Sequence, residues 1–137
     1  MKSWFMIAAV ALVPVAAATV GAYQDETPSI KSVMGKLHKG SKAQSKVLDQ
    51  QSKAGSPNWD EIQKTTKDFV ILGASLSKND PPRGDKASWK KLADNYFQNA
   101  KALDDAARDK NLTALQATQK KLGGSCKSCH TAHREEK

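Results

Sequence analysis

The stretch GSCKSCHTAHRE, at residues 124–135, holds both cysteines of this 137-residue chain. Cys126 and Cys129 are separated by two residues, and His130 follows the second cysteine directly. Three kinds of site use two cysteines at this spacing: a thioredoxin-like redox pair, a zinc site and a covalent haem attachment site. Each needs a different context, so the rest of the sequence decides among them.

The context favours covalent haem. A redox pair of this type expects alternating strands and helices, and the chain shows no strand pattern. A zinc site needs four ligands; Cys126, Cys129 and His133 supply three, with His38 as a distant fourth. In the haem alternative, each thiol bonds one vinyl group and His130 becomes the proximal iron ligand. Two thiols three positions apart lie on one helical face, which suits this attachment. We therefore expect one haem c per chain.

Apolar residues upstream recur at spacings of three and four, which is typical of amphipathic helices. The first predicted helix has Thr27 as its N-cap and Pro28 at its first position. It continues past Leu48 and ends at AGSPN, residues 54–58.

Three further helices complete the pattern. The second begins near Asn58, with Glu61 placed as in a capping box. The remaining predicted segments are a loop at residues 77–86, a third helix over 89–107, a turn at 108–111 and a fourth helix from Leu112 to the cysteines. Gly123 and Gly124 weaken the fourth helix, and mark either a bulky group close to the backbone or a frayed end. The fold class is all-α, an antiparallel up-down-up-down four-helix bundle.

The N-terminus has the layout of a secretory signal peptide over residues 1–22. Lys2 precedes an apolar run at residues 4–13, and small residues follow Pro14. The alternative is an uncleaved membrane anchor, because the apolar stretch is nearly long enough to span a bilayer. We expect export, to the periplasm or its equivalent, and a single domain over residues 23–137. The net charge of +8 would become +7 on loss of Lys2. The sequence contains no dense basic block with interleaved aromatics, so nucleic-acid binding is not expected.

A helical chain with CxxCH near its C-terminus resembles the class II c-type cytochromes, the cytochrome c′ family. CKSCHTAHR is similar to that family's pattern, in which CxxCH is followed by two or three residues, then an aromatic and then a basic residue. Arg134 matches the basic residue. It lies four residues after His130, on the same face, where a cation could pair with a haem propionate or tune the potential of the iron; the alternative is an ordinary exposed arginine. His133 stands where relatives usually have tyrosine, so it is given no role.

The resemblance also places the distal side of the haem on the first helix. Aligning SIKSVMGKLHKG, residues 29–40, with that helix puts Met34 at the distal position. Relatives with a ligating methionine are low-spin electron carriers, whereas others have an open site that admits small gases. We therefore predict a one-electron carrier rather than an enzyme, with His130 and Met34 as axial ligands. His38, one helical turn further on, is a rival distal ligand. The alternative function is a five-coordinate protein that binds nitric oxide or carbon monoxide.

Lysines flank the attachment motif and suggest how a partner is chosen. Lys120, Lys121 and Lys127 would form a basic rim near the haem edge and steer an acidic redox partner. The same residues also suit an ordinary solvated face. The resemblance implies that a homodimer could form through the first two helices. Contact with a membrane is expected only if residues 1–22 stay attached.

Overall fold

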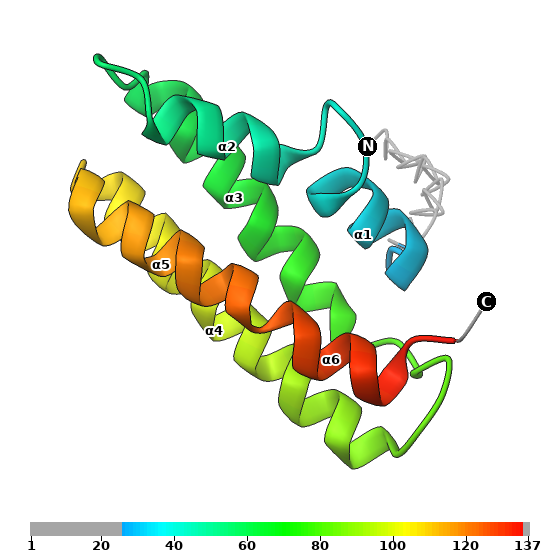
Figure 1. Ribbon diagram of the computed structural model, residues 1–137. Coiled ribbons are helices and arrows are strands. Elements are labelled where there is room, and N and C mark those ends of the chain that lie inside the picture. The colour runs from blue at the N-terminus through cyan, green and yellow to red at the C-terminus, as the bar shows by residue number, and fades with distance from the viewer. Residues whose placement is uncertain (1–25, 136–137) are drawn as a thin grey trace, which may run out of the picture.

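The computed structural model describes residues 26–135, and every regular element among them is an α-helix (Figure 1). The helices are α1 (Ile30–His38), α2 (Gln44–Ser52), α3 (Trp59–Leu76), α4 (Lys86–Arg108), α5 (Leu112–Gly124) and α6 (Cys126–His133). The predicted all-α fold class is thus confirmed. The predicted signal peptide or anchor, residues 1–22, lies outside the described residues. Within residues 26–135, no helix is both long and apolar enough to cross a membrane.

The first predicted helix is wrong in two respects. The N-cap is Ser29 rather than Thr27: the Ser29 hydroxyl accepts a hydrogen bond from the Ser32 amide at 3.2 Å. The helix is also broken into α1 and α2. Between them, Gly40 has a φ of +93°, a left-handed conformation that residues with a Cβ avoid. The chain turns at this glycine, and α2 starts in a new direction.

The start of α3 agrees with the prediction. The Asn58 side chain accepts a hydrogen bond from the Glu61 amide at 3.3 Å, as an N-cap does. The Glu61 carboxylate does not complete a capping box; it accepts a hydrogen bond from Gln51 of α2 at 2.8 Å. This contact ties α2 to α3. At the start of α4, Asp85 is the N-cap and accepts from the Ser88 amide at 2.7 Å.

The fourth predicted helix is interrupted at Ser125, between α5 and α6. The Leu122 carbonyl accepts hydrogen bonds from the Ser125 amide at 3.1 Å and from the Ser125 hydroxyl at 2.6 Å. The two cysteines therefore sit on a short helix of their own. A Cβ added at Gly123 or Gly124 would meet no atom within 4 Å.

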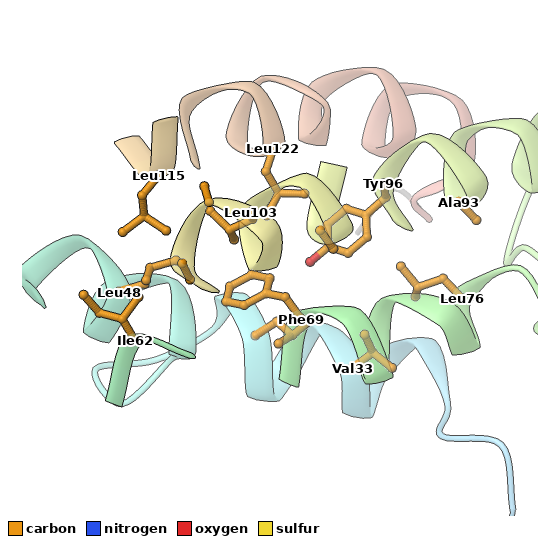
Figure 2. Packing of buried hydrophobic residues seen from close by; sticks show 14 of the residues in the cluster. Val33, Leu48, Ile62, Phe69, Leu76, Ala93, Tyr96, Leu103, Leu115 and Leu122 are labelled. Atoms are coloured by element: carbon orange, nitrogen blue, oxygen red, sulfur yellow. The ribbon is translucent and has the colours of Figure 1, made fainter. Parts of the chain in front are cut away.

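The core lies where α3, α4 and α5 face α1 and α2 (Figure 2). Helices α3 and α4 form the most extensive contact, and α4 also packs against α5 and α6. The largest fully buried apolar side chains of the core are Phe69, Leu37, Leu48, Ile62, Leu103, Leu115 and Val33. In Figure 1, α5 and α6 follow each other along α4, which places the cysteine motif beside the loop that joins α3 to α4.

Candidate haem-binding site

Cys126 and Cys129 lie in the first turn of α6, and both are half-buried free thiols. Cys129 packs against the apolar core. Burial raises the pKa of both thiols above the ordinary value. Their three-residue spacing on a helix puts the two sulfurs on neighbouring positions of one face. The predicted pair is therefore presented together, at the edge of an apolar region.

His130 follows on α6 and is exposed. Within residues 26–135, no hydrogen bond engages its imidazole ring. A histidine ligand must offer an unprotonated ring nitrogen to the metal. The His130 ring is thus free for that role.

His38 of α1 and Tyr96 of α4 form a polar pair close to this motif. The His38 Nε2 atom and the Tyr96 hydroxyl are 2.8 Å apart. Burial and the nearby charge of His130 lower the pKa of His38. Burial, with Cys126 nearby, raises the pKa of Tyr96 far above its ordinary value. Helix α4 packs against the cysteine helix α6, and Phe69 lies edge-on to the His38 ring, with centroids 5.7 Å apart.

Met34 lies one turn before His38 on α1 and is half-buried. Its side chain packs against the apolar core. A thioether is at most a weak hydrogen-bond acceptor, so its sulfur is not committed to a strong polar partner. Both candidate distal ligands therefore lie on the same helix, one turn apart.

His133, to which the family resemblance gave no role, is the most buried residue of α6, at 2% exposure. Its Nδ1 atom is 2.8 Å from the Arg83 carbonyl, and its Nε2 atom is 3.2 Å from the Ser88 hydroxyl. The only sequence signal for this residue was its spacing, four positions after Cys129 and seven after Cys126. That spacing places it on the thiol face of the helix.

The remaining predicted residues lie at the surface. Arg134 is exposed and ends α6, and its amide donates to the His130 carbonyl at 3.1 Å. Its contact with a propionate stays a prediction. Lys120, Lys121 and Lys127 are also exposed. In the part of the chain that is described, no three or more His, Cys, Asp or Glu side chains are placed to hold a metal ion together.

These residues fit haem c. The chemistry requires two free thiols on one helical face and a neighbouring imidazole with an available nitrogen. Cys126, Cys129 and His130 meet these requirements. Both thiols are half-buried and Cys129 packs against the apolar core, which suits a macrocycle that is itself largely apolar.

The comparisons with known proteins agree with this site. Residues 84–134 match the family model described as Cytochrome C′, a range that includes α4, α5, α6 and the whole cysteine motif. The match supports a class II c-type cytochrome and implies covalently bound haem c with iron. Neither the curated proteins nor the solved structures contain a match to the chain.

Proposed function

From the premise that α4 to α6 are those of a class II c-type cytochrome with covalent haem c, we propose that the protein is an exported one-electron carrier. The haem iron supplies the one-electron redox chemistry when the cofactor is bound. The observation that carries the proposal is the arrangement of α6. Two half-buried free thiols share one face, and the next residue, His130, has an uncommitted ring.

Three residues of α6 would hold the haem. Cys126 and Cys129 hold the cofactor covalently, and His130 is the proximal ligand. A covalently held ring cannot dissociate, and the apolar core beside it limits the access of water. Both features suit a protein that transfers electrons without chemical change to a substrate, and no catalytic role is proposed for any residue.

We assign the distal position to Met34. Its thioether is half-buried and carries no strong hydrogen bond. The Nε2 atom of His38, by contrast, is engaged with the Tyr96 hydroxyl. Ligation through that nitrogen would give up a hydrogen bond worth about 1 kcal/mol. This difference supports Met34 over His38.

The finer architecture follows the same proposal. Helices α1 and α2 together would be the first rod of an up-down-up-down bundle, α3 and α4 the second and third, and α5 with α6 the fourth. Residues 1–22 would direct export to the periplasm, and residues 23–137 would form the single domain. Two thiols committed to one cofactor suit an oxidising compartment, where free thiols tend to pair.

The partner is proposed to be an acidic redox protein. The exposed lysines beside the motif, Lys120, Lys121 and Lys127, give that surface a positive charge.

A homodimer contact is also proposed, through α3. Ile71 of this helix is a large apolar side chain that is 62% exposed, which is compatible with such a contact.

A second candidate function is the binding of nitric oxide or carbon monoxide at a five-coordinate site. The observation that favours it is the polar pair of His38 and Tyr96 close to the motif. Hydroxyl and imidazole groups can donate hydrogen bonds to a small bound ligand. In this alternative, Met34 only packs beside the gas.

Absorption spectra of the haem-loaded protein, with and without carbon monoxide, separate these functions. We expect a low-spin spectrum that does not respond to carbon monoxide. Met34→Leu keeps the side-chain volume and removes the sulfur, and should make the protein responsive. His38→Gln is the matched control and should stay low-spin. A responsive wild-type protein would make gas binding the function, and loss of the low-spin spectrum in His38→Gln would make His38 the ligand.

A further inference from the structure

We propose that His133 is a positioning residue that fixes the rotation of α6 about its own axis, and thereby aims Cys126, Cys129 and His130. The proposal deepens the function proposed above and rests on it for its consequence at His130. The contacts that carry it lie entirely within the described protein.

Both nitrogens of the His133 ring are used. The Arg83 carbonyl can only accept, so Nδ1 carries the hydrogen and donates across 2.8 Å. Nε2 lies 3.2 Å from the Ser88 hydroxyl, which can donate a hydrogen bond to this nitrogen or accept one from it. The ring also lies edge-on to Trp89, with centroids 5.4 Å apart and an interplanar angle of 83°. Both ring nitrogens of His133 are therefore engaged by protein groups, and neither is available to iron.

The loop before α4 is shaped to receive the end of α6. Gly84 has a φ of +83°, and a Cβ at this position would lie 2.9 Å from the Ala132 carbonyl oxygen and 3.0 Å from His133 Nδ1. Only glycine permits so close an approach. The Arg83 guanidinium donates to the Thr131 carbonyl at 2.7 Å. That carbonyl is among the last four of the helix, which have no partner within it.

The position of His133 explains why this contact controls the motif. Seven residues are about two helical turns, so His133 lies on the same face as Cys126, and it follows Cys129 by about one turn. Helix α6 has only eight residues, too few to be stable alone in water. Holding one side chain of that face therefore sets the direction of the two thiols, and with them the direction of His130.

The same contacts distinguish the two histidines of the sequence CHTAH. His130 is exposed and its ring is uncommitted, whereas His133 is buried and engaged at both nitrogens. These contacts leave His130 available for the iron ligation proposed above and commit His133 to positioning.

Three variants of the full chain test the proposal. His133→Phe keeps an aromatic ring beside Trp89 and removes both hydrogen bonds. His133→Asn retains a donor near the Nδ1 position and should partly restore the wild-type behaviour. Ile62→Val is the control, because it weakens the core near Leu48, away from α6 (Figure 2).

The measurements are amide hydrogen exchange along the chain, the ¹⁵N chemical shifts of the His133 ring and the haem spectrum. We expect exchange in α6 to become at least tenfold faster in His133→Phe, with α3 and the centre of α4 unchanged. The ring should carry a proton on Nδ1, and the spectrum of the bound haem should shift in His133→Phe but not in Ile62→Val.

Three results would overturn the proposal. One is unchanged exchange in α6 of His133→Phe. Another is an increase spread evenly over all helices, as a general loss of stability would give. The third is a ring signal showing His133 bound to iron. Absence of covalent haem in the wild-type protein would refute the proposed function instead, and the exchange comparison would still judge His133.

Discussion

At the scale of single residues, His38 combines burial with a hydrogen bond and a charged neighbour. Its Nε2 atom pairs with the Tyr96 hydroxyl, and its ring contacts Phe69. Burial, together with the charge of His130, lowers the pKa of His38 below 6.5. The folded protein therefore holds this ring neutral over a range in which an exposed histidine takes up a proton.

This difference predicts a pH dependence of stability. As the pH falls below about 6.5, the unfolded chain binds a proton at His38 before the folded protein does. The contribution of His38 to the free energy of unfolding is thus complete above that pH and declines until the pH passes the lowered pKa. Denaturant titrations between pH 5 and pH 8, a range on the order of that spanned by histidine pKa values, should show this decline.

Two variants assign the decline to the imidazole. His38→Gln can still hydrogen-bond to Tyr96 but does not titrate, so the decline should become shallower. Tyr96→Phe keeps the buried imidazole and should keep the slope while lowering stability by about 1 kcal/mol. Identical slopes in the wild type and in His38→Gln would show that another group is responsible.

At the scale of the elements, Gly123 and Gly124 end α5, and substitution can show whether they are there to admit a bulky group close to the backbone. A Cβ at Gly123 would meet no atom within 4 Å. In a helix, alanine is favoured over glycine by about 1 kcal/mol. Gly123→Ala should therefore raise the free energy of unfolding by about that amount, as measured in urea.

Gly40→Ala is the matched control. A Cβ there also meets nothing within 4 Å, but the φ of +93° strains any residue other than glycine. The substitution should therefore destabilise the protein by about 1–2 kcal/mol. If Gly123→Ala instead impairs haem attachment, the glycine is there to admit the cofactor close to the backbone.

The same elements show what the sequence could and could not predict. The apolar spacing predicted the helices, and Asn58 predicted the start of α3, because both signals are local. The break at Gly40 was missed since the apolar pattern continues across it. The cysteine motif predicted the chemistry of the site. The docking of His133 was not predictable, because its partner Arg83 lies 50 residues away in the chain.

At the scale of the whole molecule, stability should depend on the shared core far more than on the surface. Leu103 of α4 is fully buried within the cluster that α3, α4 and α5 form. Leu103→Ala should lower the free energy of unfolding by about 2–5 kcal/mol, through lost burial and the cavity left behind. Ile71→Ala is the control: this side chain is 62% exposed, and its loss should change stability by about 0.5 kcal/mol or less. Comparable losses in both variants would mean that the Ile71 face is itself covered, as in a dimer.

The positive charge of the molecule leads to a prediction about the rate at which it transfers electrons to an acidic partner. The net charge is +8, and such a field attracts acidic partners at a distance. What distinguishes the lysines beside the motif is their position near the site where electrons would leave. Replacing Lys120, Lys121 and Lys127 by glutamine should lower the rate of electron transfer to an acidic redox protein about tenfold at low salt. The same substitutions should weaken the dependence of that rate on ionic strength.

A second triple variant separates local steering from total charge. Lys64 and Lys67 are exposed on α3, and Lys110 lies in the turn between α4 and α5, at the opposite end of the molecule from α6 (Figure 1). Glutamine at these three positions removes the same charge and, at 0.1 M salt, should slow the transfer much less, because exposed charges more than about 10 Å apart are largely screened at that salt concentration. Stopped-flow rates measured over a series of salt concentrations make the comparison. Equal losses in the two triple variants would mean that net charge alone brings the partners together, and the basic rim beside the haem would have no special part in it.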